Sequence, residues 1–356
     1  MAYGYVTLWV LIKGKDVKKS MKKGKHKTVE YGRYGYLFIA PFFLAYLIFS
    51  AWPLLYTVIL SFKNEYYSTT TFQTISEWNG IENYIFCLVD SSKGLFQTRT
   101  IMALGNTIFM WIFNFVPQIA LSLLLAAWFT DSKIKLRGQG AYKVIVYMPN
   151  IITASTISVL FYSMFNYPSG PVNLVMTGLG IWDEPFQFFQ NALATRLIVA
   201  FIQFWMWYGN TMVVLIAGIL GIDPALFEAA NVDGANSTQI FWHITVPLLR
   251  PILLYTLVTS AIGGLQMFDI PKLLTTSGLG DPDYATQTIT MYIRDLAFTG
   301  AKQMGKSSAA SMVLFFVTLV LSLLLFYIMR DKEAIKEKKQ IKAAKKAQIA
   351  REAGMR

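Results

Sequence analysis

The sequence predicts an all-α, polytopic membrane protein with six transmembrane helices and a short helical segment on the cytoplasmic side. The chain of 356 residues is 54% hydrophobic and only 15% charged, and its mean hydropathy is +0.44, which is unusual for a soluble domain. Six apolar stretches reach the length of about 20 residues that a helix needs to cross a bilayer. We expect spans at Tyr36–Phe62, Ile101–Phe129, Val144–Phe165, Leu197–Leu220, Pro247–Ile270 and Ser308–Met329.

The positive charge is divided unevenly between the two sides of these spans. Residues 1–33 hold nine Lys or Arg, the tail from Arg330 holds ten, and the loop 131–140 holds three. Eight are spread over the 105 residues of the other loops, at 63–100, 167–196 and 271–307. Lys and Arg concentrate on the cytoplasmic side of membrane proteins, so we expect both termini in the cytoplasm and the chain in the cell membrane.

The same count defines the expected domains. Residues 1–35 form a basic cytoplasmic N-terminal segment, 36–330 a six-helix transmembrane domain, and 331–356 a basic cytoplasmic tail. These basic ends indicate topology and contact with anionic lipid, and no basic stripe on a soluble domain favours nucleic acid. The single cysteine, Cys87, excludes an internal disulfide and a multi-cysteine metal site.

The segment with the clearest helix-start and turn signals is polar and lies between the fourth and fifth spans, at 222–243. Asp223 before Pro224 indicates a helix start, with the carboxylate as N-cap. Asp233-Gly234 indicates a turn, and Asn236 with Gln239 three residues later resembles a capping box. We therefore expect two short helices joined by a sharp turn at the cytoplasmic surface.

Residues for catalysis are scarce. The chain has two histidines, His26 and His243, and no HExxH, GxSxG or P-loop motif. Nothing resembles an ion-selectivity filter. These observations favour a transport pathway that is driven by the energy of another protein, and they predict neither a catalytic residue nor a metal ligand in this chain.

Polar residues inside the spans are candidates for solute contact. Gln203, Trp207 and Asn210 in the fourth span combine an aromatic ring with amides, as sugar sites do, although an aromatic belt at the interface explains the tryptophan equally simply. Gln266 and Asp269 end the fifth span, where Asp269 is either a functional carboxylate or a helix-end residue in water. Asn114, Pro117 and Gln118 fit hydrogen bonding between helices at least as well as a solute role.

The cytoplasmic segment resembles the EAA motif of ABC importer permeases over about 24 residues. The matching positions are Glu228-Ala229-Ala230, Asp233-Gly234-Ala235, Phe241, Ile244, Pro247 and Pro251. Other stretches are similar to the carbohydrate-uptake branch of that family, and more to the first permease of maltose, glycerol-phosphate or multiple-sugar systems than to the second. They are Asn106-Thr107, Met148-Pro149-Asn150, Gly170 to Asn173, Phe268-Asp269 and Thr275 to Gly278. The sequence departs from the family's Gly-Gly-Pro-like loop at Gly278 to Pro282.

The resemblance implies one half of a translocation pathway for a sugar or oligosaccharide. A second homologous permease would complete it, two cytoplasmic ATPase subunits would bind ATP and Mg, and an extracellular solute-binding protein would deliver the sugar. Glu228 to Gly234 would form the coupling helix, with Glu228, Ala229, Ala230, Asp233, Gly234 and Ala235 contacting the ATPase. Gln203, Trp207, Asn210, Gln266 and Asp269 would contact the solute.

Two alternatives stay open from the sequence. One is an importer permease for another solute, such as glycerol phosphate. The other is a membrane-embedded transferase acting on lipid-linked sugars, which would require an acid/base pair or a metal site that the side chains of this sequence do not supply.

Overall fold

The computed structural model describes residues 32–90, 94–131, 137–275 and 277–329. The predictions for most of the basic N-terminal segment and for the Lys-rich tail lie outside these ranges. The described chain divides into two units, one ending at Tyr56 and the other beginning at Thr57. Each unit is considered by itself.

The first unit is a helix that contains one π-helical turn. It comprises α2 (Gly32–Tyr46), η1 (Leu47–Ala51) and the first half of α3 (Trp52–Ser61). Pro41 lies inside α2 and does not end it, and the extra residue of the π turn comes between Pro41 and Pro53. The stretch Gly35–Ser61 is long and apolar enough to span a bilayer, which confirms the first predicted span.

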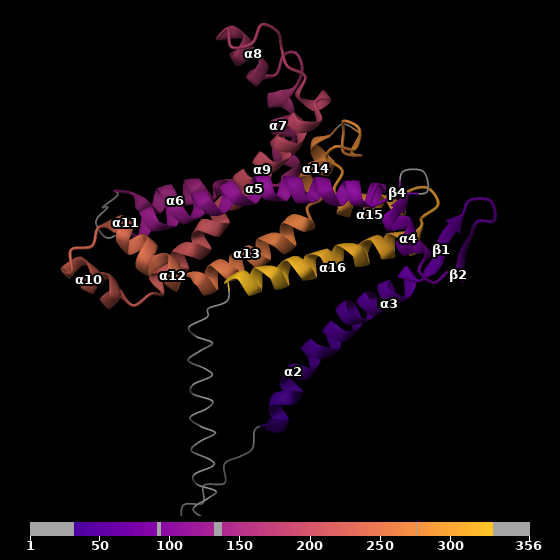
Figure 1. Ribbon diagram of the computed structural model, residues 1–356, viewed down its shortest axis with the longest axis horizontal. Helices are drawn as coiled ribbons and strands as arrows, with labels where there is room; N and C mark the ends of the chain where they lie inside the picture. Colours follow the sequence, from indigo (N-terminus) through magenta and orange to yellow (C-terminus); the bar gives the residue numbers. More distant parts are fainter. Residues whose placement is uncertain (1–31, 91–93, 132–136, 276, 330–356) are drawn as a thin grey trace, which may run out of the picture. The chain divides into compact units, whose positions relative to one another are not determined.

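Four further stretches of the second unit are long and apolar enough to cross a membrane. They are α5 (Arg99–Thr130), α9 (Ala192–Leu220), α13 (Arg250–Leu265) with α14 (Asp269–Leu274), and α16 (Met304–Met329). The helices α5 and α9 pack along each other most extensively, and α13 packs on α16 (Figure 1). These spans begin two to five residues before the predicted ones, except the fifth, which begins after Pro247 because α12 (Val246–Leu248) precedes it.

The third predicted span is a bent pair of helices. It consists of α6 (Gln139–Tyr147), η2 (Met148–Ile151) and α7 (Ala154–Phe165), and its two halves meet at 90°. Pro149 is the second residue of a tight helical turn, Ile152 is extended, and the Thr153 hydroxyl caps α7 by accepting from the Thr156 N–H. These features stop one helix and start another in a new direction, so α7 projects from the layer formed by α5, α9 and α13 (Figure 1).

Short elements gather at the two ends of this bundle. At one end lie α10 (Pro224–Val232), α11 (Ser237–Ile240), the π-helical η4 (Phe241–Thr245) and α12 (Figure 1). At the other end lie α4 (Glu82–Leu88) and α15 (Ile289–Phe298), while α8 (Pro171–Gly178) and η3 (Phe188–Gln190) follow α7.

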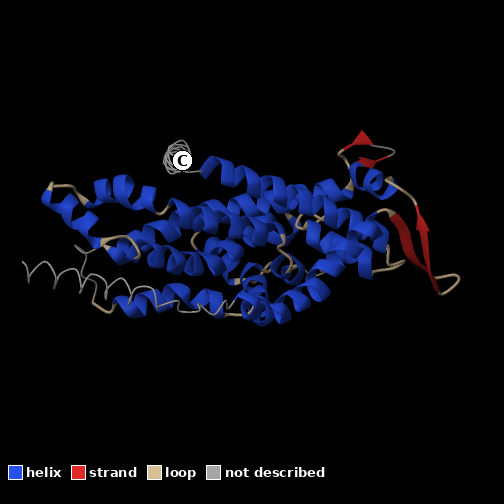
Figure 2. Cartoon of the chain, turned by 90° about the horizontal axis from the view of Figure 1, so that it is seen from below, coloured by secondary structure: helices blue, strands red, loops and turns tan. Residues whose placement is uncertain are grey.

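The all-α expectation omitted two small antiparallel hairpins. The larger pairs β1 (Lys63–Ser68) with β2 (Gln73–Trp78), with Lys63 opposite Trp78, and appears as the long red strands of Figure 2. The smaller pairs β3 (Val89–Asp90) with β4 (Gly94–Leu95). Thr, Tyr, Ile and Trp are enriched in the larger hairpin, which is the composition that favours strands. The predominantly helical class is unaffected.

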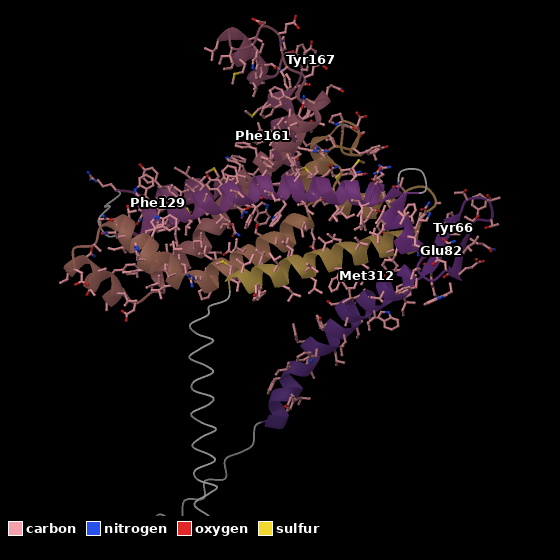
Figure 3. The ribbon with its side chains drawn as sticks, viewed as in Figure 1. Tyr66, Glu82, Phe129, Phe161, Tyr167 and Met312 are labelled. Carbon is pink, nitrogen blue, oxygen red and sulfur yellow. The ribbon has the colours of Figure 1, made fainter. Side chains whose placement is uncertain are left out.

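The interior of the second unit is a chain of apolar clusters. One joins Met110 of α5, Phe161 of α7, Ile202 of α9 and Ile270 of α14, and it is the contact that holds the projecting helix (Figure 3). A second, near the α10 end, joins Phe129, Leu215 and Leu249 with their neighbours. The helices are held together by apolar burial that their sequences provide on one face.

Candidate functional site

A cavity of about 460 Å³ lies among α5, α9, α13 and the start of α14. This volume falls in the range of about 300–1,000 Å³ that is typical of small-molecule sites. All five side chains proposed from the sequence line it: Gln203, Trp207, Asn210, Gln266 and Asp269. The structure therefore brings these residues together, while their contact with a solute stays a prediction.

The three residues from α9 share one face of that helix. Gln203, Trp207 and Asn210 follow one another at spacings of four and three residues, which places side chains one above the other on a helix. The Trp207 side chain is 47% exposed, and Gln203 and Asn210 are half-buried. An indole face beside two amides can stack on an apolar surface and direct hydrogen bonds to hydroxyl groups.

The other two residues flank a break between helices. The helix α13 ends at Leu265, Gln266 to Phe268 are not helical, and α14 begins at Asp269. Gly264 is required just before this break, because a Cβ at that position would overlap the Trp111 indole. The break turns Gln266, Phe268 and Asp269 toward the cavity, which they line.

The sequence interpretation missed a polar face on α13. Tyr255, Thr256, Thr259 and Ser260 line the cavity opposite α9. The signal was available, since these positions recur at a spacing of four residues within an apolar span. The Thr256 and Thr259 hydroxyls donate to carbonyls of their own helix, at Ile252 and Tyr255, which leaves their remaining oxygen lone pairs for a solute.

Asn114 and Gln118 of α5 also line the cavity. The Gln118 amide donates to the Thr211 hydroxyl at 2.8 Å, so this side chain joins α5 to α9. This is the hydrogen bonding between helices that the sequence favoured for Gln118. Asn150 of η2 holds the bent pair to α9 by donating to the Met206 carbonyl at 3.3 Å. Gly209 lets the end of α6 approach α9, because a Cβ there would lie 2.5 Å from the Val146 carbonyl oxygen.

The charge in the cavity is sparse and of one sign. Among the described residues that line it, Asp269 is the only ionisable carboxylate and none is basic. The one ion pair within the described ranges, Arg294 with Asp295, lies outside the lining. The cavity is therefore suited to solutes that hydrogen-bond without carrying negative charge.

The polar segment between α9 and α13, at the end of the bundle where α10 lies, has the local structure that its sequence predicted. Asp223 caps α10 by accepting from the Ala225 N–H at 3.0 Å, and Pro224 is the first helical residue. After Asp233, Gly234 adopts φ +80°, a left-handed conformation that favours glycine. Asn236 and Gln239 then form a reciprocal capping box that begins α11.

This segment, Asp223 to Gln239, which we call the coupling segment, exposes a mixed surface. Glu228, Ala229, Asp233, Gly234 and Leu226 are exposed, and Val232 is 87% exposed. Ala230 is buried, so its small size serves packing within the chain, and Ala229 carries the small-residue surface. Leu226 and Val232 were not among the predicted contacts, although exposed apolar side chains on a short, well-capped helix are typical of a docking surface.

The fold and the cavity define a multi-pass membrane protein of the permease type. Residues 105–332 match the family described as binding-protein-dependent transport system inner membrane component. The chain belongs to this family of ABC transporter permeases, whose members are transport components of the inner membrane.

Two relatives and one solved structure illustrate the similarity. The lactose transport system permease protein LacF of Rhizobium radiobacter is 30% identical over 299 residues, covering 84% of this chain and 95% of the relative. The arabinooligosaccharides transport system permease protein AraP of Bacillus subtilis is 28% identical, covering 81% and 86%. A bacterial ABC transporter involved in the import of the acidic polysaccharide alginate gives a TM-score of 0.69 at 24% identity, covering 85% of this chain and 97% of that chain, and this likeness concerns the fold.

Proposed function

We propose that the chain forms half of the translocation pathway of an ATP-driven importer for a sugar or oligosaccharide. The observation that carries the proposal is the cavity, in which an exposed indole, several amides and several hydroxyls face one another. Sugars present hydroxyls around an apolar ring face, and this lining matches both features. The relatives' names support it, since LacF and AraP are permeases for a disaccharide and for oligosaccharides.

The charge of the cavity argues against glycerol phosphate. A phosphate group requires basic side chains or converging backbone N–H groups, and the described lining contains no basic side chain but includes Asp269. An uncharged sugar needs no basic partner in the cavity, and the Asp269 carboxylate does not repel it. The cavity thus supports an uncharged sugar over the other solute that the sequence left open.

The coupling segment is the proposed link to the energy source. A second homologous permease would complete the pathway, and two cytoplasmic ATPase subunits would bind ATP and Mg. An extracellular solute-binding protein would deliver the sugar, and both termini would lie in the cytoplasm with the coupling segment. The exposed Glu228 and Ala229 and the turn at Gly234 support this role, because they present a small, capped helix to a partner. This chain itself would catalyse no reaction.

The test is uptake by the complete transporter. The chain is expressed with the proteins of its genomic neighbourhood, purified as a complex and reconstituted with ATP inside vesicles and labelled sugars outside. Glu228→Ala combined with Gly234→Pro is expected to abolish uptake while the complex still contains a folded chain. Gly105→Ala is the control, because Gly105 is exposed on α5 and a Cβ there meets no atom within 4 Å.

Uptake that persists in the double variant would exclude the coupling role. The cavity is tested separately with Trp207→Ala and Gln203→Ala, which are expected to raise the KM for the transported sugar about tenfold, the effect of roughly 1.4 kcal/mol of lost binding. An unchanged KM in both variants would exclude the cavity as the sugar site. Sugar turnover by the isolated chain would instead favour the transferase.

A further inference from the structure

The turn between α14 and α15 is fastened to the bundle by buried polar contacts. It comprises residues 278–288, and Thr286, Gln287 and Thr288 are fully buried. Gly280 has φ +94°, and a Cβ there would overlap the Gln287 backbone, so the turn is folded tightly on itself. Its Thr286 N–H donates to the Gly280 carbonyl at 3.1 Å. This turn is therefore a compact element with a fixed internal shape.

Two arginines and an asparagine hold the turn to α5 and α9. Arg99 donates to the Gln287 side chain at 2.9 Å and lies 3.7 Å from the centre of the Tyr284 ring. Arg196 donates to the Ala285 carbonyl at 2.8 Å. Asn106 donates to the Tyr284 carbonyl at 2.9 Å and lies buried beneath the turn. The two arginine bonds are charge-assisted, and such bonds are roughly twice as strong as neutral ones.

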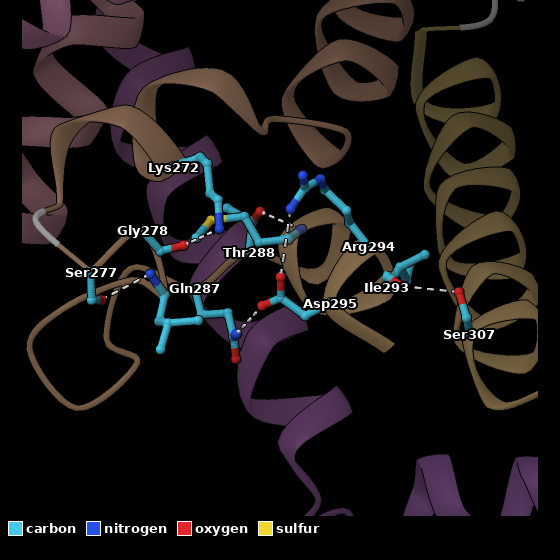
Figure 4. Close-up of polar contacts among 11 residues, drawn as sticks. Lys272, Ser277, Gly278, Gln287, Thr288, Ile293, Arg294, Asp295 and Ser307 are labelled. Carbon is cyan, nitrogen blue, oxygen red and sulfur yellow. Dashed lines mark hydrogen bonds and ion pairs between the residues drawn. The ribbon is translucent and has the colours of Figure 1, made fainter. Parts of the chain in front are cut away.

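At its inner end the turn reaches the cavity wall. The Thr288 hydroxyl donates to the Met267 carbonyl at 2.9 Å, and the Ile289 N–H donates to the Thr107 hydroxyl at 2.9 Å. Figure 4 shows Thr288 beside Gln287, whose amide donates to Asp295. Met267 lies in the break between α13 and α14, next to Gln266 and two residues before Asp269, and all three line the cavity.

The N–H groups at the start of this break make only long hydrogen bonds. The Gln266 and Met267 N–H groups donate to the Gly263 and Gly264 carbonyls at 3.3 Å each, which is long for a helix end. The Met267 carbonyl receives its bond from Thr288. A buried carbonyl that lost this partner would be desolvated without compensation, so the bond determines where the break lies.

We propose that Thr288 is a positioning residue for the cavity. Through the Met267 carbonyl it fixes the positions of Gln266 and Asp269, and it links the turn at 278–288 to the cavity wall. The inference rests on the proposed function, because it makes the position of two residues of the proposed sugar site depend on this turn. A force on the turn, such as contact with another protein at that end of the bundle, is passed to the two cavity residues through buried bonds. The turn and the wall then move as one element.

The first test measures the wall directly and requires no transport. Gln266→Cys is labelled with a nitroxide in the full chain purified with its partner subunits, while the native Cys87 is fully buried and stays unlabelled. Thr288→Val is expected to add a mobile component to the electron paramagnetic resonance spectrum. The mobile-to-immobile ratio should rise about fivefold, the effect of losing one buried hydrogen bond.

Two variants distinguish positioning from general loosening. Thr288→Ser keeps the hydroxyl and should restore the immobile spectrum. Thr288 is also the N-cap of α15, where its hydroxyl accepts from the Met291 N–H. Thr98→Val is the matched control, because Thr98 is likewise a buried N-cap whose hydroxyl donates to a carbonyl of another segment, that of Cys87, away from the cavity. If Thr288→Val does not fold, Thr107→Val loosens the same junction from α5. An unchanged spectrum, or equal mobility in Thr98→Val, overturns the proposal.

The second test uses uptake with the transported sugar. Thr288→Val should raise the KM about fivefold with a smaller change in maximal rate, and Thr288→Ser should restore it. A fall in maximal rate at constant KM would overturn the positioning role. Absence of uptake in every variant and in the unaltered transporter would count against the proposed function alone, because the resonance measurement still decides the role of Thr288.

Discussion

The guanidinium of Arg196 in α9 donates a 2.7 Å hydrogen bond to the side-chain oxygen of Asn106 in α5. The amide nitrogen of the same asparagine donates to the Tyr284 carbonyl, so one buried side chain joins two spans and the turn before α15. This arrangement explains why a polar Asn106-Thr107 pair occurs inside an otherwise apolar segment.

Replacing Arg196 should destabilise this end of the bundle. Arg196→Ala removes the bonds to Asn106 and to the Ala285 carbonyl, and we expect a loss of about 2 kcal/mol in unfolding free energy. Arg196→Lys, which has a charge but not the planar fork, should lose a smaller amount. Thermal unfolding followed by intrinsic fluorescence measures both. Equal melting temperatures for all three chains would show that the contacts contribute no net stability.

Gly209 should not tolerate a side chain. A Cβ at this position would lie 2.5 Å from the Val146 carbonyl oxygen and 2.9 Å from the Tyr147 Cα, and both of these atoms belong to the backbone of α6. We expect Gly209→Ala to cost about 1–3 kcal/mol, as overpacking does. Gly105→Ala, with open space around it, should be neutral or stabilising because alanine favours a helix. Denaturant titration of the pair provides the comparison, and a stable Gly209→Ala chain would contradict the close approach.

The exposed surface of α10 should be needed for ATPase recruitment. Val232→Asp and Ala229→Trp place a charge and a bulky ring on this surface, and each should reduce co-purification of the ATPase at least tenfold. Ile181→Asp, at an exposed position away from α10, should leave it unchanged. Circular dichroism verifies the fold. Full recovery of ATPase with both α10 variants would show that the partner binds elsewhere.

Asp269 should influence which solutes enter the cavity. The carboxylate is the one charged group in the described lining, so Asp269→Lys reverses the charge there. We expect an anionic sugar, such as a uronic acid, to compete with the transported sugar about tenfold better in this variant, since opposite unit charges about 4 Å apart attract by about 1 kcal/mol even in water. Inhibition constants from competition uptake measure this. Identical constants for both chains would remove Asp269 from the selectivity of the site.

Cys87 should resist alkylation while the chain is folded. The thiol is fully buried beside α16, and burial raises the pKa of Cys87 above the ordinary thiol value. The folded chain therefore holds this proton more tightly, and the resulting stability is present below the ordinary pKa and is lost as the pH rises through the higher one. N-ethylmaleimide at pH 7 should label only denatured protein, as mass spectrometry would show. Rapid labelling of folded chains would contradict the burial.

The sequence predicted the parts of this structure that depend on local patterns. Span positions come from the length of apolar stretches, and the caps at Asp223 and Asn236 come from side chains that satisfy free N–H groups at helix starts. Gln203, Trp207 and Asn210 were predicted because an aromatic ring beside amides is typical of sugar sites, and Asp269 because a carboxylate close to the membrane is a functional candidate. The structure groups all five predicted residues around one cavity, although their binding of a sugar stays a prediction.

Features that depend on tertiary packing were not predicted. The two halves of the third span meet at 90°, and in this arrangement Phe161 of α7 packs among Met110, Ile202 and Ile270. No local sequence pattern specifies these contacts. The spacing of the α13 hydroxyls is visible in the sequence, but that this face of α13 lines the cavity depends on how the helices pack. The β1–β2 hairpin is built on a contact with distant residues, where the Tyr67 N–H donates to the Ala301 carbonyl at 2.7 Å.

The π-helical η4 lies between the coupling segment and the fifth span, and a π turn holds one residue more than an α turn. Deleting one residue from Phe241–Thr245 can therefore convert this stretch into an α turn without rotating the coupling segment relative to the fifth span. A deletion in a regular α-helical turn has no such extra residue to remove, and it rotates the two flanking parts by about 100°. The π turn is thus the place between the pathway and the coupling segment where the chain can lose a residue and keep the relative orientation of the two parts.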